Sequence, residues 1–569
     1  MAEPLTPRFH PVVRMAWTWA LPAALGIFLR LFALPGQVLV DDEWHSLNFV
    51  LGKSFFSVLT THGLGANCIP QNAIHWLLLH TVGWSETTLY LPSVLCGIAG
   101  LLVFPRLVER IARRKIAGTF AWLFAISPCV IFYSRIVRPY SMVIFFGFLS
   151  LLCLASWLQE GRRGDLLGYA LSGFAAIYFH LYAALPVLSP LVVLFMTSLV
   201  RPQFFREAPW ITRRRMAATG LLLGLLLLGF LGPVHWVNPW WLRVLARDRV
   251  TPHGLWEFLS LLAGSRFAWL KLAFASLAAW GLLRLIRQEP RVGLLFASVW
   301  AACFLLLAIG SQDGMHAAIQ IARYNIVLFP VALSLVAIAI DEIAIRLPVH
   351  LRPVPAVLAV AALAAGGPLG RTARLPNNFM HHSAFQDSYA AFDWNWSRMR
   401  ALTPLPQMPA TRIPPLYAAI AADPGVRGII EYPMFIGDPL NFHYFYQHFH
   451  RKSVAAGYVP DFPFPPLPSR DDYVAQDTPI DYVFSRARAL GLEKQMRFAN
   501  LLPITDPARL RRNHSGWLLI VHRDLLRETL GIQLENGNFL APILLPVSLE
   551  AAWGKPAFAD SQILAWRIP

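Results

Sequence analysis

Three consecutive acids stand where the chain leaves its first long apolar run. Asp41, Asp42 and Glu43 lie with His45 in the segment VDDEWHSLNFVL at residues 40–51. Ionisable side chains this close to a membrane core are costly to hold unless they are solvated or used. A carboxylate here can act as a general base or as a metal ligand, and a solvated acidic loop is the alternative.

Two arginines occupy a turn between two later apolar runs, in FYSRIVRPYSM at residues 132–142. Arg135 and Arg138 stand three residues apart, and Tyr140 follows them. A guanidinium presents a planar fork of donors that fits phosphate oxygens. This turn is therefore a candidate phosphate site, and anchoring to lipid headgroups is the alternative.

Two further polar pairs stand at the ends of apolar runs. His180 and Tyr182 lie in YFHLYAALP at residues 178–186, and Arg323 and Tyr324 open the segment RYNIVLFP. A histidine at the end of a span is often an interfacial residue, and an arginine there can extend its side chain to the headgroups. Each pair is weak evidence when it is taken alone.

The composition indicates which elements position these residues. The chain has 569 residues, of which 56% are hydrophobic and 14% charged, and its mean hydropathy is +0.48. Soluble domains carry about 25% charged residues, so we expect a polytopic α-helical membrane protein. With about 20 apolar residues per span, about eleven spans are expected. They lie near residues 16–34, 89–105, 116–133, 137–158, 165–184, 185–200, 216–236, 267–286, 292–310, 323–345 and 354–370.

The basic residues predict the orientation of these spans. The net charge of +17 is carried by short stretches between apolar runs, which is typical of a topology signal and not of a nucleic-acid surface. Alternate connections are rich in arginine, so these connections and the amino terminus are expected in the cytoplasm. The loops near 35–88, 134–136, 237–266 and 311–322 would then be outside. All four polar clusters are thus expected on one side of the membrane.

Two stretches outside the spans are expected to have structure of their own. The loop at 35–88 contains two short apolar segments, Phe55–Leu59 and Ile74–Val82, which resemble helices lying on the membrane surface. Residues 371–569 are richer in Pro, Asn and Asp and carry β-like runs at Gly428–Tyr432, Tyr482–Ser485 and Trp517–His522. The chain is therefore divided into a membrane domain, residues 1–370, and an outer α/β or mixed domain.

The first apolar run and the cysteines argue against a cleaved signal peptide, a cysteine metal site and a disulfide-based fold. The first apolar run lacks a small-residue cleavage site and is expected to stay as an anchor. The five cysteines show neither metal-ligand spacing nor a disulfide framework.

The four clusters together resemble the GT-C superfamily of membrane glycosyltransferases. The shared pattern is an Asp-Glu pair in the first outer loop, an Arg-x-Tyr turn, a His-x-Tyr ending and an Arg-Tyr opening of a late span. The resemblance covers residues 16–345 and is closest to the bacterial branch related to protein O-mannosyltransferases and aminoarabinose transferases. The segment EYPMFIGDPLNFHYFYQ at 431–447 resembles the outer domains of some bacterial members.

This resemblance implies an inverting transfer of a sugar from a polyprenyl-phosphate donor to a hydroxyl group of a glycan, lipid or protein. Asp42 would be the general base, with Glu43 orienting it or the acceptor, although an exchange of roles with Asp41 is left open. Arg138, Arg323 and Arg135 would bind the donor phosphate. The substrate pocket would be formed by Tyr140, His180, Tyr182, Tyr324 and His45. No obligatory metal is expected, although a divalent cation is compatible with the acids.

The expected location is the bacterial cytoplasmic membrane, with the site and residues 371–569 in the periplasm. Two other classes compete with a glycosyltransferase. A transporter or lipid flippase would show paired halves with broken spans at matching positions, which the sequence lacks. A non-catalytic envelope assembly protein would tolerate loss of Asp42 and Arg138.

Overall fold

A computed structural model describes most of the membrane domain and the core of the outer domain. Asp41, Asp42, Glu43 and His45 lie outside the described residues. The described residues are 19–32, 34, 50, 53–61, 68–83, 86–237, 250–265, 267–309, 318–367, 415–432, 434–435, 450, 452–454, 501–502, 511, 515–523, 547, 549–560 and 563–569.

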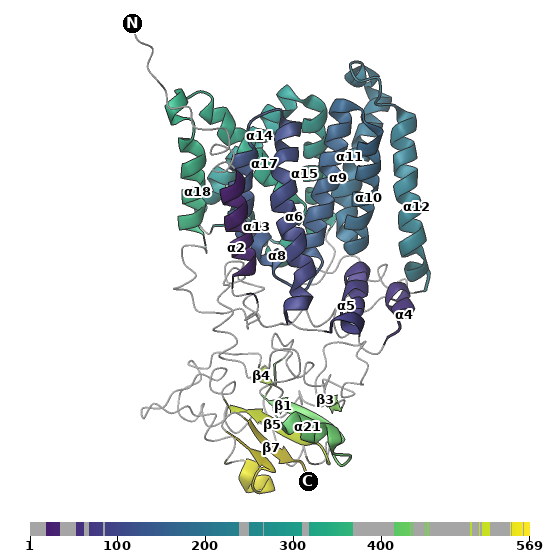
Figure 1. Ribbon diagram of the computed structural model, residues 1–569, viewed down its shortest axis with the longest axis vertical. Helices are drawn as coiled ribbons and strands as arrows, with labels where there is room; N and C mark the ends of the chain where they lie inside the picture. The colour runs from purple at the N-terminus through teal and green to yellow at the C-terminus, as the bar shows by residue number, and fades with distance from the viewer. Residues whose placement is uncertain are drawn as a thin grey trace.

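The membrane domain is a bundle of long apolar helices (Figure 1). A chain in lipid must satisfy its backbone hydrogen bonds internally, so each apolar run becomes a helix. The bundle helices are α2 (Leu21–Leu31), α6 (Glu86–Ala112), α7 (Ala117–Ile126), α8 (Pro128–Ser134), α9 (Tyr140–Glu160), α10 (Arg163–Phe179), α11 (Ala184–Val200), α12 (Arg213–Val237), α14 (Ala268–Gln288), α15 (Pro290–Ile309), α16 (Ala318–Tyr324), α17 (Leu328–Ala344) and α18 (Val354–Gly366).

The helices agree in position with the predicted spans. In the described part of the chain, seven are long and apolar enough to cross a membrane, and two bent pairs raise this number to nine. The other two predicted spans correspond to α2 and α10, which have 11 and 17 residues. The multi-pass membrane fold is confirmed, and the count of eleven stays a prediction.

Two of the predicted spans are sharply bent. α7 and α8 meet at 63°, where Pro128 begins the second helix, and α16 and α17 meet at 87°. The second bend begins at Asn325, whose amide nitrogen Nδ2 donates to the Ile321 carbonyl oxygen over 3.0 Å. Both bends lie near polar residues singled out in the sequence, so they decide where those side chains point.

The first outer loop contains two helices, α4 (Phe55–Thr60) and α5 (Ile69–Thr81), at one end of the bundle, called here the α5 end (Figure 1). Trp76 joins them, because its indole nitrogen donates to the Lys53 carbonyl oxygen over 2.8 Å and its ring lies 5.1 Å from that of Phe55. The two predicted helices are therefore present. Unlike a simple surface helix, however, α5 buries polar residues toward the bundle.

A further helix, α13 (Pro252–Ala263), lies in the segment 237–266, which the sequence placed in a loop. The Thr251 hydroxyl caps its first turn by accepting from the Gly254 amide over 3.0 Å. Gly264 ends it in the left-handed conformation, with φ of 68°, where a residue with a side chain would be strained. With only 12 residues, α13 is too short to span a membrane.

The outer domain contains a mixed sheet in the order β3-β1-β5-β7-β6. The strands are β1 (Gly428–Tyr432), β3 (Ser453–Val454), β5 (Leu518–His522), β6 (Phe558–Ala559) and β7 (Ile563–Arg567), with helix α21 (Pro415–Ala422) beside them. A separate pair is formed by β2 (Met434–Phe435) and β4 (Leu501–Leu502). β1 runs parallel to β5 and to β3, whereas β7 is antiparallel to its neighbours.

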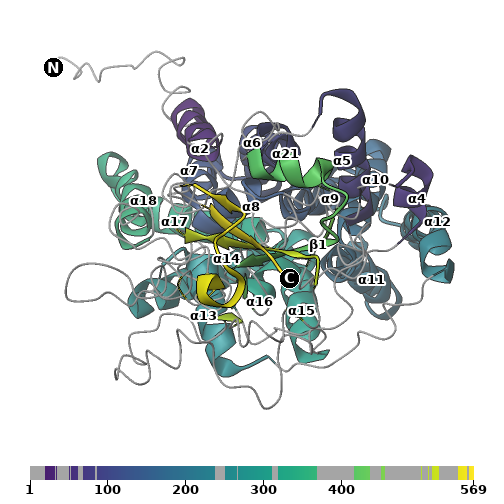
Figure 2. The same ribbon diagram turned by 90° about the horizontal axis from the view of Figure 1, so that it is seen from below.

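The sheet confirms the predicted mixed character of this domain, and two of the three predicted strands match β1 and β5. The third, Tyr482–Ser485, falls outside the described residues. Figure 1 shows the sheet beyond the α5 end of the bundle, and Figure 2, which looks from below, shows it in front of the helix ends.

The opposite end of the bundle is held by ion pairs. Glu342 on α17 is 2% exposed and contacts Arg114 at 2.7 Å, Arg284 at 2.7 Å and Arg346 at 3.1 Å. Arg114 also contacts Asp341 at 2.8 Å. These arginines come from the connections that the sequence assigned to the cytoplasmic side, so the polar clusters and the arginine-rich connections lie at opposite ends.

Candidate active site

The turn that carries Arg138 is fixed against a neighbouring helix. α8 ends at Ser134 and α9 begins at Tyr140, so Arg138 lies between them at the α5 end. The Ser93 hydroxyl on α6 donates to the Arg138 carbonyl oxygen over 3.3 Å, and the Ser141 hydroxyl donates to the Ser93 carbonyl oxygen over 2.7 Å. Since Arg138 is only 7% exposed, packing and not solvent determines where its guanidinium lies.

Arg323 approaches the same place from the bent pair α16 and α17. Its Nη1 donates to the Tyr140 hydroxyl oxygen over 3.3 Å. The Tyr133 hydroxyl donates to the Ile319 carbonyl oxygen over 3.2 Å, which ties α8 to α16. The Arg138 guanidinium carbon lies 6.0 Å from the centre of the Tyr140 ring. Tyr140 is therefore the common neighbour of the two arginines that the sequence assigned to phosphate.

An aromatic group joins the remaining predicted pocket residues to these arginines. The ring centre of His180 lies 5.6 Å from that of Tyr140, 5.5 Å from that of Tyr182 and 6.0 Å from that of Tyr324. The Tyr182 and Tyr324 rings are 4.2 Å apart. His180 follows the end of α10 in an extended conformation, and its Nδ1 accepts from the Tyr182 amide over 3.4 Å. Residues from the three later polar clusters of the sequence thus form one group, in which all the residues named here except Tyr182 are buried.

Arg135 lies in the same turn but makes a different contact. Its Nη1 donates to the Leu29 carbonyl oxygen near the end of α2 over 2.9 Å, and the residue is 2% exposed. A backbone carbonyl at a helix end is a good acceptor for a guanidinium. One role of Arg135 is therefore to hold α2 against α8, and its predicted contact with phosphate stays a prediction.

Arg30 on α2 is a buried cation that the sequence reasoning missed. It is 0% exposed, and its Nη1 donates to the Gly26 carbonyl oxygen over 2.9 Å. Gly97 on α6 makes room for it, because a Cβ there would lie 3.0 Å from the Arg30 Nε and would overlap the Ser134 hydroxyl. A charged residue inside the first apolar run was the available signal.

Three polar side chains of α5 were also missed. Gln71, Asn72 and His75 are each at most 1% exposed and lie within four residues of one another on the helix. Burial, and to a smaller extent the positive charge of Arg138, lower the pKa of His75 to about 3. His75 is therefore near Arg138, and it is a neutral imidazole at physiological pH. The signal in the sequence was the polar i, i+4 spacing within an otherwise apolar segment.

The acidic group that the sequence placed first in the mechanism is not tested by the structure. Asp42, Glu43 and His45 fall in the undescribed stretch between α2 and α4. Among the described residues, no group of three His, Cys, Asp or Glu side chains is arranged to hold a metal ion. The expectation that no metal is obligatory therefore stays a prediction.

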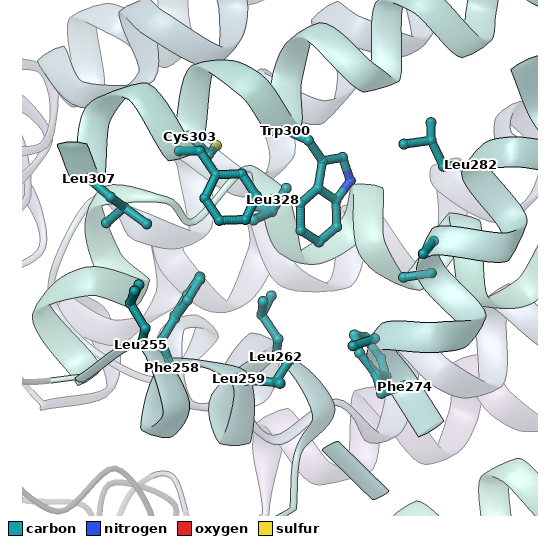
Figure 3. A pocket seen from close by; sticks show the side chains of 14 residues that line it. Leu255, Phe258, Leu259, Leu262, Phe274, Leu282, Trp300, Cys303, Leu307 and Leu328 are labelled. Atoms are coloured by element: carbon teal, nitrogen blue, oxygen red, sulfur yellow. The ribbon is translucent and has the colours of Figure 1, made fainter. Parts of the chain in front are cut away.

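A large apolar pocket lies beside α16, among α13, α14, α15 and α17. Its volume is about 450 Å³ and its lining is almost entirely hydrocarbon. In Figure 3, Leu255, Phe258 and Leu262 of α13 face Trp300 and Cys303 of α15 across the opening. Leu328, four residues after Tyr324, also lines it. The pocket is thus adjacent to the segment that carries Arg323.

A buried lysine lies close to this pocket. Lys271 on α14 is 2% exposed, and its Nζ lies 3.0 Å from the Ser260 hydroxyl and 3.5 Å from a carboxylate oxygen of Glu257. The ammonium also lies 3.8 Å from the centre of the Trp256 ring, a cation–π contact. α13 is therefore fixed to α14 by a charged contact at one end of the apolar pocket.

Sequence comparisons give no match for this chain. No family model matches it, and no curated protein matches it.

Solved structures show where the fold belongs. The crystal structure of ArnT from Cupriavidus metallidurans in the apo state has a TM-score of 0.55 and 14% identity, over 97% of this chain and 98% of that chain. The same protein bound to undecaprenyl phosphate gives a TM-score of 0.54 and 14% identity, over 96% and 97% of the two chains.

A third structure, the cryo-EM structure of the arabinofuranosyltransferase AftD from Mycobacteria, gives a TM-score of 0.50 and 16% identity, over 97% of this chain and 40% of that chain. ArnT and AftD are both GT-C superfamily glycosyltransferases. Identities this low carry the fold and not the substrates. The chain therefore shares its overall fold with ArnT and AftD, and this is the fold that the resemblance found in its sequence predicts.

Proposed function

We propose that this protein is an inverting glycosyltransferase that moves a sugar from a polyprenyl-phosphate donor to a hydroxyl acceptor at the outer face of the bacterial cytoplasmic membrane. The observation that carries the proposal is the convergence of Arg138 and Arg323 on Tyr140. Two buried guanidinium groups around one phenol, at one end of a membrane bundle, form a site of high positive potential. Such a site suits an anionic group attached to a lipid.

The chemistry of the donor explains why two arginines are useful. As the bond between the sugar and the phosphate breaks, negative charge grows on the leaving phosphate. Positioned guanidinium groups stabilise that charge more in the transition state than in the ground state, which is the requirement for catalysis. Both arginines are buried, Ser93 fixes the backbone of Arg138, and Tyr140 accepts a hydrogen bond from the Arg323 guanidinium, so little reorganisation is needed during the reaction.

The acceptor hydroxyl needs a base, and Asp42 is the proposed one. Asp42 and Glu43 precede α4 in the sequence of the first outer loop. Helix α5, later in the same outer loop, carries His75, on which the charge of Arg138 acts. A carboxylate within reach of the hydroxyl takes its proton as the new bond to the sugar forms. Adjacent acids interact, so any pH profile belongs to the pair and not to one residue.

The apolar pocket beside α16 is proposed to receive part of the polyprenyl chain. Its hydrocarbon lining and volume of about 450 Å³ suit isoprene units. The ring centre of Phe258 on α13, which lines the pocket, lies 6.2 Å from that of Phe329 on α17. The pocket is therefore next to the start of α17, which follows Arg323 in the chain. The likeness in fold to an ArnT structure bound to undecaprenyl phosphate supports the same class of donor.

The test is a donor assay with purified enzyme in nanodiscs. Release of polyprenyl phosphate from candidate polyprenyl-phosphate sugars would be compared for the parent, Asp42→Asn and Arg138→Ala. The matched controls are Glu207→Gln, whose side chain is 91% exposed, and the exposed Arg287→Ala. We expect both site variants to lose at least about 10²-fold in rate and both controls to keep the parental rate. Parental turnover in both site variants would refute the roles proposed for Asp42 and Arg138. Absence of polyprenyl-phosphate release by the parent from every donor would refute the glycosyltransferase and favour a transporter or an assembly protein.

A further inference from the structure

The inward face of α5 is polar, although the helix comes from an apolar segment. Gln71 and His75 are one helical turn apart and therefore lie one above the other, with Asn72 beside them. All three are buried, while Leu77 on the same helix is 47% exposed. An amphipathic helix normally buries its apolar side, so this arrangement is the reverse of what packing alone would select.

The position of this face is given by His75. The charge of Arg138 acts on the His75 imidazole, so His75 lies within electrostatic range of that arginine. Helix α5 also packs against α6 and α10, the helices that carry Ser93 and lead to His180. The outer side of α5 is fixed separately, through the contact of Trp76 with Lys53 and Phe55. Contacts on the outer side of α5 therefore fix the orientation of its polar face.

The Gln71 side chain has hydrogen-bonding groups that the described part of the protein does not satisfy. This side chain is 1% exposed, and within the described residues neither its amide oxygen nor its amide nitrogen has a hydrogen-bond partner. Burying both polar atoms of an amide without partners is costly. Such a group is retained where a ligand supplies the partners.

The chemistry of the face selects the kind of ligand. A carboxamide offers two donors and an acceptor, and a neutral imidazole offers one donor and one acceptor. Neither carries a charge, so this face does not compete with the arginines for phosphate. Hydroxyl groups, which both donate and accept, are the matching partners, and a sugar presents several of them close together.

We propose that Gln71, Asn72 and His75 bind the hydroxyl groups of the sugar attached to the donor phosphate, so that α5 determines which sugar the enzyme accepts. This inference rests on the proposed function, because it takes the phosphate to lie at Arg138 and Arg323. It assigns the selection of the sugar to the first outer loop and the binding of the lipid phosphate to the bundle.

The experiment compares two ligand types on the full-length protein in nanodiscs. One is polyprenyl phosphate, which lacks a sugar. The other is a panel of polyprenyl phosphates carrying mannose, glucose, galactose or arabinose. Variants are Gln71→Ala and Gln71→Met, which keeps the side-chain length, with Leu77→Ala as the control on the outer side of α5 and Arg138→Ala as the phosphate control. Monodispersity and thermal unfolding report whether each variant is folded.

The expected result is that the parent binds at least one sugar-bearing donor more tightly than polyprenyl phosphate. Both Gln71 variants should weaken that donor about tenfold or more and raise its KM, while their affinity for polyprenyl phosphate stays within a factor of two. Leu77→Ala should change neither, and Arg138→Ala should weaken both.

Three outcomes would overturn the inference. In the first, no sugar in the panel adds affinity. In the second, both Gln71 variants bind the sugar-bearing donor as the parent does. In the third, they weaken both ligands equally, which a merely structural role would produce. Failure of the parent to bind polyprenyl phosphate at all would instead refute the proposed function.

Discussion

Arg323 donates a hydrogen bond from Nη1 to the hydroxyl oxygen of Tyr140 across 3.3 Å, although 183 positions separate the two residues in the chain. The contact joins the start of α9 to the end of α16, just before the 87° bend between α16 and α17. It gives Tyr140 two functions: to orient Arg323 by accepting its hydrogen bond, and to pack against Arg138.

The first prediction concerns this contact. Tyr140→Phe removes the acceptor oxygen and keeps the ring, so Arg323 loses its orientation and not its charge. We expect kcat to fall about tenfold, corresponding to one hydrogen bond of about 1.4 kcal/mol. Tyr169→Phe is the matched control, because the Tyr169 hydroxyl donates to the Val187 carbonyl oxygen over 2.8 Å. That variant should lose stability and keep kcat. An unchanged kcat in Tyr140→Phe would show that Tyr140 acts only through packing of its ring.

The second prediction separates charge from shape at Arg138. Arg138→Lys keeps one positive charge but loses the planar fork that can hold two phosphate oxygens together. We expect Arg138→Ala to lower kcat about 10²–10³-fold, and Arg138→Lys to recover only part of that loss. Pre-steady-state measurement of the single-turnover rate checks this, since it reports bond breaking without product release. Full activity in Arg138→Lys would mean that a point charge suffices and that the fork geometry is unused.

The sequence predicts the fold better than it predicts the contacts within the candidate site. Apolar runs of sufficient length predict the bundle because lipid requires helices, and the β-like run at Gly428–Tyr432 coincides with β1. α13 was missed because the arginine pattern assigned its segment to an outer loop, and an apolar segment too short to span a membrane gives no further sign of a helix. Sidedness predicted that Arg138, His180 and Arg323 share one end of the bundle.

Contacts within the site needed the structure. The approach of Arg323 to Tyr140 depends on the bend at Asn325, which no spacing rule gives. The polar face of α5 was hidden because the flanking apolar residues favour an interfacial helix. Its direction becomes visible only when Gln71 and His75 are seen to be buried.

The third prediction is a pH dependence of stability from His75. Its pKa is about 3 in the folded protein and ordinarily 6.5, so below pH 6.5 the unfolded chain takes up a proton that the folded one does not. Stability is therefore full above pH 6.5 and falls as the pH decreases toward 3. At pH 5 the loss is about 2 kcal/mol. His75→Gln should abolish this part, measured as the difference in thermal unfolding between pH 7.5 and pH 5.

His450 in the outer domain behaves alike, because burial also lowers its pKa to about 3. It is unchanged in His75→Gln, so its contribution cancels when the variant is compared with the parent. Identical pH dependence in the parent and in His75→Gln would show that the imidazole of His75 is solvated or charged in the folded protein.

The fourth prediction concerns the end of the bundle opposite α5. Glu342→Gln removes the charge that three arginines share and leaves Arg114, Arg284 and Arg346 close together without it. Removing the shared carboxylate leaves three neighbouring positive charges without their common partner, so we expect a lower thermal midpoint. The site is at the other end, so kcat and KM at low temperature should stay parental. A selective loss of activity without a loss of stability would contradict this structural role.

The fifth prediction tests the apolar pocket as the place of the lipid chain. Ala278 on α14 is buried and lines the pocket, so Ala278→Phe places a ring in the space that isoprene units would occupy. We expect KM to rise about tenfold for a long polyprenyl-phosphate donor, the equivalent of about two lost methylene contacts. A short-chain donor that ends before the pocket should keep its KM. Ala273→Phe, on the exposed side of the same helix, is the control. An equal rise of KM for both donors would mean that the substitution distorts the site and that the chain lies elsewhere.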